Sequence, residues 1–334
     1  MDPYFSGSKI KWLLDNIEGA RDRAEAGDLA FGTPDTYVLW RLTGGRIHAT
    51  EPSNASRTLL LNLQTLDFDE AMLDIFDVPR SLLPEIRDSD ANFGTTSRNV
   101  VGAEIPITGI LGDQQASLFG QCGWDTDVVK ATYGTGIFLL ASTGELIRNF
   151  DKLLTTVAWK TRERVSYALE GSLFMGGASI QWLRDNLGLL KNAAESEEKA
   201  LAVPDNDGVY FVPAFQGLGA PYWNAGARGT LIGLTRRTTS DTIVRAVLES
   251  LAYQVRDVID EMKREAACDY SVLRVDGGAS MNGFIMQFQS DLLQLPVERP
   301  EITETTALGA AGISGISSGF WTFDSFADIR RVSR

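Results

Sequence analysis

The feature that most constrains this chain is a pair of glycines, Gly277-Gly278, set between two apolar runs. The run before them, Ser271 to Val275, is strand-like, and the run after them, Phe284 to Leu295, is helix-like. Glycine has no Cβ, so the backbone can come close to a bulky ligand, and the free N–H groups at a helix start can bind phosphate. Strand, Gly-Gly and helix therefore predict a nucleotide site, although many α/β proteins use two glycines only to turn the chain.

The composition is that of an ordinary globular protein and argues against several classes of partner. The chain has 334 residues, enough for two domains with cores of their own, and its formal net charge is 31 − 44 = −13. This acidic excess argues against nucleic acid and anionic membranes. An anionic substrate such as ATP must therefore be met locally, by backbone amides, a few basic groups or a metal ion.

Cysteine, histidine and hydropathy patterns narrow the choice further. The two cysteines, Cys122 and Cys268, lie far apart in the sequence and indicate a reducing cytosol rather than a disulfide framework. The only histidine, His48, excludes a multi-histidine metal site, and we expect it to be a strand or turn residue without chemistry. No run of 18 apolar residues predicts a membrane span, and the first residues lack the pattern of a signal peptide. We expect a cytoplasmic protein.

Apolar spacing predicts four helices besides the one after Gly278. The first is capped by Ser6 or Ser8 and ends near Gly27, and the second begins at Thr33-Pro34 and ends at Gly44-Gly45. The others are predicted over residues 178–187, after Gly176-Gly177, and over residues 240–264. The last of these has one inner apolar stripe, made of Ile243, Val247, Leu251, Val255, Val258 and Met262.

Strand signals complete a mixed α/β pattern. Residues 105–111 are predicted to form a buried strand that leads into Gly112-Asp113 and a helix. Residues 128–140 predict a hairpin around the turn Tyr133-Gly134-Thr135-Gly136, and residues 153–169 predict a second hairpin. We place a domain junction at residues 121–127.

Several long motifs resemble the FGGY carbohydrate kinases. Residues 4–16 match one signature of that family at every defined position. Residues 229–234, with residues 246–249 downstream, resemble a second signature, and Thr242 stands where the family usually has a larger polar residue. Further runs are similar to those of the family's glycerol-phosphorylating members: residues 54–58, 112–121, 132–136, 168–171 and 177–185.

The resemblance implies an actin-like ATPase fold, in which two ribonuclease-H-like α/β domains close on a cleft. Residues 1–121 would be the latter part of the first domain, on the polyol side, and residues 122–334 the second domain, on the nucleotide side. The family's opening Asp-Gln-Gly-Thr-Thr-type hairpin and its Arg-Glu pair for the polyol have no counterpart in this sequence. The end also comes early, so we expect a shortened form of the family's chain.

The resemblance makes Asp113 the catalytic base, which takes the proton of the attacking glycerol hydroxyl. Without it, a Gly-Asp pair at a strand end is commonly an Asx turn or a helix cap. The polyol contacts that it implies are Tyr4, Gln114 and Phe138, together with Asp113. Taken alone, Tyr4 is an N-terminal aromatic and Phe138 an ordinary core residue of a strand.

The nucleotide contacts that the resemblance implies are Thr135, Gly177, Gln181, Gly278 and Asn282. Thr135 lies in a glycine-flanked turn that can form an amide nest for phosphate, but hairpins favour glycine for conformational reasons as well. Gln181 could equally be a solvated helix residue, and Asn282 a helix N-cap.

ATP with Mg²⁺ is the expected cofactor pair, the metal being held mainly by phosphates and waters. No residue is assigned as a direct ligand. Asp113 could assist through water, and Asp276 is a second candidate, although a turn role fits it equally well.

The implied function is ATP-dependent phosphorylation of glycerol to sn-glycerol 3-phosphate, in a protein that we expect to form a homo-oligomer. One alternative keeps the chemistry and changes the substrate to a related sugar or polyol. Another is a catalytically inactive remnant that only binds nucleotide. A substrate panel separates the first alternative, and a nucleotide titration beside a glycerol-dependent turnover assay separates the second.

Overall fold

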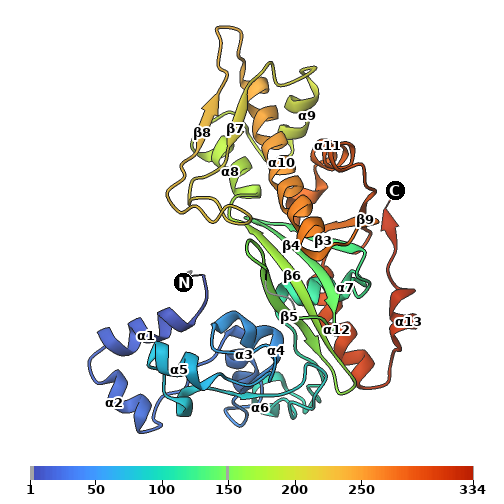
Figure 1. Ribbon diagram of the computed structural model, residues 1–334. Helices are drawn as coiled ribbons and strands as arrows, with labels where there is room; N and C mark the ends of the chain where they lie inside the picture. Colours follow the sequence, from blue (N-terminus) through green and yellow to red (C-terminus); the bar gives the residue numbers. More distant parts are fainter. Residues whose placement is uncertain (1–3, 148–149, 334) are drawn as a thin grey trace.

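The computed structural model describes residues 4–147 and 150–333. Figure 1 shows a central twisted sheet with helices on both faces, and a separate group of short helices at the lower left. That group, which we call the N-terminal part (residues 4–110), also contains a two-stranded parallel sheet. Its elements are α1 (Gly7–Asn16), α2 (Ala20–Glu25), α3 (Pro34–Leu42), β1 (Ala49–Thr50), α4 (Pro52–Ala55), η1 (Ser56–Thr58), α5 (Glu70–Phe76), η2 (Arg80–Leu82), β2 (Glu85–Ile86) and α6 (Arg98–Val101).

The central sheet has seven strands in the order β11-β10-β9-β3-β4-β6-β5. Strands β3, β9 and β10 are parallel to one another, and the remaining neighbours are antiparallel. The strands are β3 (Val128–Tyr133), β4 (Ile137–Gly144), β5 (Leu154–Lys160), β6 (Val165–Leu173), β9 (Val272–Asp276), β10 (Val297–Pro300) and β11 (Val332–Ser333).

The remaining elements cover this sheet or extend from it. A small hairpin of β7 and β8 lies beside α10 at the top of Figure 1. These elements are α7 (Asp113–Gly120), α8 (Gly177–Asp185), α9 (Glu195–Leu201), β7 (Tyr210–Val212), β8 (Thr230–Ile232), α10 (Ser240–Ala266), η3 (Gly278–Met281), α11 (Gly283–Leu293), α12 (Thr305–Ser317) and α13 (Phe323–Ala327).

The two faces of the sheet are covered by different helices because strand side chains alternate between faces. Val129, Ala131 and Tyr133 of β3 belong to the largest apolar cluster, which α10 and α11 complete. The opposite face contributes Leu140 and Trp159 to a cluster completed by α7, α12 and α13. Lys130 and Thr132, which alternate with the first set, must therefore lie on the α7 face.

The two predicted hairpins are confirmed, as β3–β4 and β5–β6. The long helix is confirmed as α10, with five of its six stripe residues fully buried and Ile243 partly buried. Thr239 caps its N-terminus by accepting a hydrogen bond from Thr242 N, and Ala267 ends it in the left-handed conformation.

The strand, Gly-Gly and helix prediction is also confirmed, with changed boundaries. β9 ends at Asp276, a short 3₁₀ turn (η3) follows, and α11 stops at Leu293 instead of Leu295 because Gln294 takes a left-handed conformation. Helix α8 likewise stops two residues before the predicted end, at Asp185.

Two predictions in the N-terminal part are wrong. The single helix up to Gly27 is two helices, since Ile17 is extended and Gly19 adopts a left-handed φ of 72°. Ser6 does occupy the N-cap position of α1, but its side chain makes no capping hydrogen bond.

The segment predicted as a buried strand, residues 105–111, is extended but belongs to no sheet among the described residues. It makes one isolated bridge, from Pro106 to Thr95, and Ile105 is 54% exposed. Local apolar character was not enough here, because a strand needs a neighbouring strand and Pro106 has no N–H to donate.

Helices α7 and α12 approach each other so closely that glycine is required at the contact. A Cβ on Gly309 would lie 1.7 Å from the carbonyl oxygen of Ala116, and a Cβ on Gly120 would lie 2.1 Å from that of Thr305. This contact fixes the helix that begins with Asp113 against the C-terminal region. Within the described residues, no helix has the length and apolar character needed to cross a bilayer.

We predict that Gly309→Ala lowers the free energy of unfolding by about 1–3 kcal/mol or more, because the added methyl group forces the two helices apart. Urea denaturation measures this change. Ala307→Ser, on an exposed position of the same helix, is the matched control and should stay within about 0.5 kcal/mol of the unaltered chain. Equal stability of both variants would contradict the close approach.

Candidate active site

Two glycine turns and the start of α8 surround a pocket of about 410 Å³, which we call the glycine-turn pocket. This volume is within the range of small-molecule sites. All five predicted nucleotide residues line it, namely Thr135, Gly177, Gln181, Gly278 and Asn282. The structure therefore brings together residues up to 147 positions apart in the sequence, from Thr135 to Asn282.

The glycines of this pocket differ in what they do. A Cβ on Gly277 would lie 2.6 Å from the carbonyl oxygen of Tyr133, and its φ of 84° is left-handed, so this glycine is needed by the fold. A Cβ on Gly278 would meet no atom within 4 Å. That free space lies in the pocket itself, where a ligand can approach the backbone.

Asn282 has a structural role as well as a place in the pocket. Its Oδ1 accepts a hydrogen bond from Ile285 N at 3.0 Å, which caps α11, and its Nδ2 donates to Ser196 Oγ at 3.1 Å. The alternative reading of this residue as a helix N-cap is confirmed. The capping bond also orients the start of α11 at the pocket.

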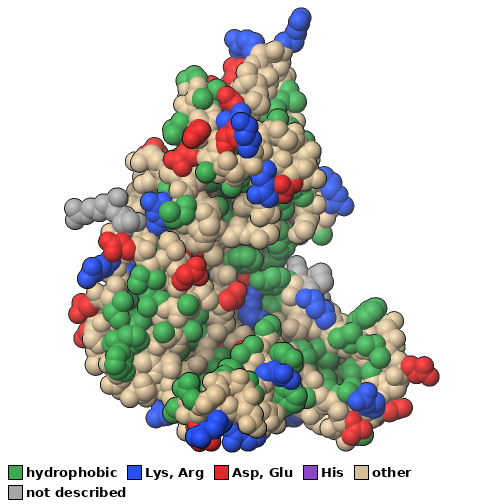
Figure 2. Space-filling view, turned by 180° about the vertical axis from the view of Figure 1, so that it is seen from behind, with side chains coloured by type: hydrophobic (Ala, Val, Ile, Leu, Met, Phe, Trp, Pro, Cys, Tyr) green, Lys and Arg blue, Asp and Glu red, His purple; other side chains and the backbone are tan. Residues whose placement is uncertain are grey.

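A second cavity, of about 750 Å³, lies between α7 and the N-terminal part, and we call it the Asp113 cavity. Tyr4, Arg57 and Asp113 line it together with α3 residues and Thr306 of α12. Figure 2 shows the surface hollowed between the N-terminal part, at the lower right, and the rest of the chain. Tyr4 and Asp113, both predicted polyol contacts, are thus brought to one cavity.

Asp113 is the first residue of α7, and its exposed side chain opens into this cavity. Its Oδ1 accepts a hydrogen bond from Gln114 N at 2.8 Å. The preceding residue, Gly112, donates its N–H to Ser53 Oγ at 2.8 Å, and Ser53 in turn donates to the carboxylate of Glu51. The start of α7 is therefore anchored to a buried side-chain network and not to a strand.

Glu51 is fully buried and its carboxylate is surrounded by donors. Ser89 Oγ donates to it at 2.7 Å and Asn54 N at 2.7 Å, besides Ser53. Burial raises the pKa of Glu51, while the hydroxyl and amide donors oppose that rise. The network holds α4, which carries Asn54, next to the Asp113 cavity.

Arg57 links the N-terminal part to the central sheet. Its guanidinium forms a bidentate ion pair with the buried carboxylate of Glu170 on β6, at 2.5 and 2.9 Å. It also lies 5.2 Å from the ring centre of Tyr4 and 5.1 Å from that of Phe5, so it positions the aromatic pair by cation–π contact. Burial lowers the pKa of Arg57, but the charge and hydrogen bonds of Glu170 together with those of Tyr4 outweigh burial and raise it.

Gln114 and Phe138 are not among the residues that line the Asp113 cavity. Gln114 follows Asp113 on α7, and its Oε1 accepts a hydrogen bond from Lys130 Nζ at 2.7 Å. Phe138 on β4 is half-buried and pairs in register with Thr132 of β3. Both residues therefore lie next to the α7 face of the sheet.

Asp276 connects the Asp113 helix to the glycine-turn pocket. Its buried carboxylate accepts hydrogen bonds from Ser117 Oγ and Thr305 Oγ1 at 2.6 Å each and from Gln121 Nε2 at 3.2 Å. Burial alone would raise the pKa of Asp276, but the Lys130 ammonium and the hydroxyl donors outweigh burial and lower it.

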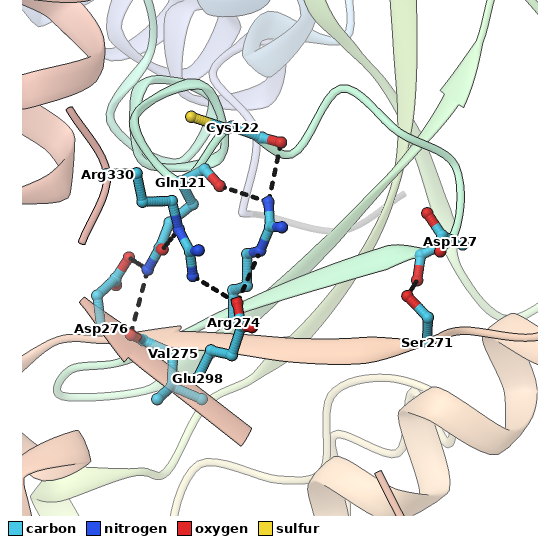
Figure 3. A network of polar contacts seen from close by, with 9 residues as sticks. All are labelled: Gln121, Cys122, Asp127, Ser271, Arg274, Val275, Asp276, Glu298 and Arg330. Atoms are coloured by element: carbon cyan, nitrogen blue, oxygen red, sulfur yellow. Dashed lines mark hydrogen bonds and ion pairs between the residues drawn. The ribbon is translucent and has the colours of Figure 1, made fainter. Parts of the chain in front are cut away.

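Figure 3 shows further polar contacts between the end of α7 and β9, next to Asp276. Arg274 of β9 donates to the carbonyl oxygens of Gln121 and Cys122 at 2.7 and 3.0 Å. Its Nε lies 3.3 Å from Glu298, which also pairs with Arg330 at 2.8 Å. These contacts hold the C-terminal end of α7 against β9 at Arg274, the residue directly before Val275 and Asp276.

The metal expectation can be tested on these contacts. Among the described residues, no group of three or more acidic, cysteine or histidine side chains could hold a metal ion. One oxygen of Asp276, Oδ2, already accepts three protein donors, so this atom is not open to a metal ion. Asp113 fits a water-mediated contact, because its side chain is exposed in the cavity.

Sequence reasoning assigned no role to Arg57, Glu170 and Lys130. The first two lie in runs that resemble the family's motifs, 54–58 and 168–171, so the signal was present. Their pairing joins positions 113 residues apart and became visible only in the folded chain.

Comparisons with known proteins show the family of this chain. The C-terminal domain model of the FGGY family of carbohydrate kinases matches residues 129–318, and the N-terminal domain model matches residues 1–120. The fold is that of the carbohydrate kinases, and the chain belongs to the FGGY family of carbohydrate kinases.

Individual relatives are more specific. The chain is 55% identical over 322 residues to glycerol kinase 2 of Thermotoga maritima and 54% identical over 321 residues to glycerol kinase of Aquifex aeolicus. Each match covers 96% of this chain and 65% of the relative, so the chain spans just under two thirds of their length. The expected shorter length relative to the family is confirmed.

Solved structures match the actin-like fold that was expected. The crystal structure of Plasmodium falciparum glycerol kinase with ADP has a TM-score of 0.91 at 38% identity, covering 100% of this chain and 67% of that one. Gluconate kinase from Lactobacillus acidophilus has a TM-score of 0.84 at 22% identity, covering 98% of this chain and 67% of that one, and shares the fold.

We predict that Gly278→Ala weakens binding of ATP or ADP at least about tenfold, the loss expected when a methyl group intrudes on a fitted ligand. Its stability should not fall, because the new methyl group meets no protein atom. Calorimetric titration and thermal melting measure the two effects.

The matched variant is Gly277→Ala, whose methyl group would meet Tyr133. It should lower the free energy of unfolding by about 1–3 kcal/mol, since both its φ and its space favour glycine. Unchanged nucleotide affinity in Gly278→Ala would remove this turn from the nucleotide site.

Proposed function

We propose that this protein transfers the terminal phosphoryl group of ATP to glycerol and forms sn-glycerol 3-phosphate. The observation that carries the proposal is the 55% identity to a glycerol kinase over 96% of this chain. The geometry agrees, since a pocket between glycine turns and a cavity with an exposed carboxylate are joined through α7 and β9. The related gluconate and xylulose kinases share the fold at only 19–22% identity, far below the identity to glycerol kinases.

In this proposal Asp113 is the general base. Its side chain is exposed in the cavity, and a base must come within hydrogen-bond reach of the hydroxyl whose proton it takes. Tyr4 contributes an aromatic wall that Arg57 holds in place. Gln114 and Phe138 would contact the polyol from the neighbouring α7 face of the sheet.

The nucleotide would occupy the glycine-turn pocket. Thr135 and the backbone N–H groups of its turn would meet the phosphates, as would the open backbone at Gly278. Gly177 begins α8 in the wall of the pocket, where its N–H donates to the carbonyl oxygen of Gly134 at 2.8 Å, and Gln181 lies one turn further along the same wall. Asn282 caps α11 and orients the start of this helix at the end of the pocket where the adenine would bind.

Mg²⁺ would be held mainly by the nucleotide phosphates, with Asp113 reaching it through water. When bound, the ion neutralises charge that develops on the transferred phosphoryl group. The chain's own part is to orient both substrates and to exclude water, so that ATP is not hydrolysed.

Three further assignments belong to the proposal. Residues 1–121 and 122–334 would act as the polyol-side and nucleotide-side domains. The protein would form a homo-oligomer, for which the exposed Trp12 and Tyr37 of the N-terminal part offer apolar surface. The two cysteines are unpaired, in keeping with the cytoplasm as its compartment.

We predict that Asp113→Asn lowers the turnover number roughly 10²–10⁴-fold, the usual contribution of a general base, with little change in ADP affinity. Glycerol-dependent ADP release measures turnover. Asp74→Asn, on an exposed position of α5, is the control and should keep full activity. A loss of only a few-fold in Asp113→Asn would refute the assignment.

The same assay with a panel of glycerol, xylulose and gluconate tests the substrate. Turnover restricted to glycerol supports the proposal, and preference for another member of the panel replaces glycerol by that substrate. Nucleotide binding without turnover of any of them would support the catalytically inactive form instead.

A further inference from the structure

Lys130 is a buried cation to which the proposed reaction gives no role. It lies in the middle of β3 with 0% of its surface exposed, on the sheet face that α7 covers. Its neighbours on that face are largely apolar, including Leu118 and Phe119 of α7 and Leu140 of β4. A buried ammonium is costly, so its position requires compensating partners.

The direct partners of Lys130 are neutral. Its Nζ donates to Gln114 Oε1 at 2.7 Å and to Thr132 Oγ1 at 2.7 Å. Among the described residues it makes no ion pair within 4.0 Å. Burial lowers the pKa of Lys130, while the carboxylates of Asp276, Asp113 and Glu170 act against this from longer range.

These contacts decide which way the carboxamide of Gln114 is turned. A lysine ammonium has only donors, so the amide atom that faces it must be the oxygen. The Nε2 of Gln114 then lies on the other branch of the amide, where it makes no hydrogen bond among the residues that the structure describes. Gln114 is half-buried, so part of its side chain is exposed at the start of α7, one residue after Asp113.

We propose that Lys130 is a positioning residue for the acceptor alcohol: its ammonium holds Gln114 so that this side chain meets the polyol as a hydrogen-bond donor. A hydroxyl group whose oxygen accepts from Gln114 keeps its own proton free for a neighbouring acceptor, and Asp113 is the adjacent carboxylate. With Lys130 in place, Gln114 is the hydrogen-bond donor and Asp113 is the acceptor at the start of α7. This inference rests on the function proposed above.

Lys130 also ties this arrangement to the nucleotide side. Its second partner, Thr132, lies in register with Asp276, which ends β9 directly before Gly277-Gly278. The same Asp276 accepts from Ser117, one turn after Gln114 on α7. Because Ser117 Oγ also lies 3.5 Å from Thr132 Oγ1, a path of polar side-chain contacts joins Gln114, through Lys130, Thr132 and Ser117, to Asp276.

The test uses the whole chain and measures glycerol binding by calorimetry in the presence of ADP, and turnover where it occurs. Gln114→Glu keeps the length of the side chain and a partner for Lys130 but replaces the donor by an acceptor. We expect glycerol affinity and the KM for glycerol to worsen about tenfold or more, as for a lost hydrogen bond that leaves two acceptors facing each other. The KM for ATP should stay unchanged.

Lys130→Met removes the anchor of the amide, and we expect a loss of about three- to tenfold in glycerol affinity, with ADP affinity retained. In a Gln114→Ala background the same substitution should add nothing, because the lysine acts through that amide. Lys160→Met, a strand lysine whose partner is Asp88 at 3.3 Å, is the matched control and should bind glycerol normally.

The outcomes separate this inference from the proposed function. If the unaltered chain binds none of the polyols, the proposed function fails and this assignment fails with it. If the unaltered chain binds glycerol and Gln114→Glu binds it equally well, only the assignment of Gln114 as donor is overturned. Additive losses in Lys130→Met and Gln114→Ala overturn the positioning role of Lys130, as does a Lys130→Met effect confined to stability.

Should Lys130→Met not fold, the comparison of Gln114→Glu with Gln114→Ala on the intact core still decides the donor role. An NMR measurement of the Lys130 ammonium then decides the contact, since its signal must shift or exchange faster in Gln114→Ala. An unchanged ammonium signal in that variant would overturn the inference.

Discussion

The carboxylate of Asp276 is the point at which the separate elements of the site are held in one arrangement. It is 2% exposed, and a buried carboxylate is tolerated only if hydrogen bonds and a nearby cation replace the water that it has lost. The donors come from α7 and α12, through Ser117, Gln121 and Thr305, and the cation is Lys130 on β3. Movement of any one of these elements would remove part of the compensation for this buried charge.

This requirement divides the sheet into two faces with different tasks. The face towards α10 is apolar along β3, where Val129, Ala131 and Tyr133 belong to the main core. The face towards α7 carries Lys130 and Thr132 within an apolar surround. These buried polar residues are expensive in stability, and they lie beside the helix that begins with Asp113. The close approach of Gly120 and Gly309 keeps α7 at this place.

The parts of the fold that were predicted from sequence are those whose signal is local. The glycine turns, both hairpins and α10 follow from residue spacing within one or two dozen positions, and all are present. The five nucleotide residues were named through motifs of the same length and line one pocket. The strand predicted over residues 105–111 is absent from the sheets, because the apolar character of a segment says nothing about whether a strand lies beside it. The prediction of one continuous helix across Gly19 was wrong because the apolar spacing of a helix continues on both sides of this residue.

The sequence by itself determined the family, the periodicity of the strands and the positions of the glycines that a ligand can approach, since each of these depends on residues close together in the chain. Only the tertiary structure decided which charges meet. Arg57 forms an ion pair with Glu170, and Lys130 acts on the Asp276 carboxylate from longer range; both interactions join positions more than a hundred residues apart. Such pairs form because burial removes water from both groups at once, and burial is a property of the packed chain that no short stretch of sequence contains.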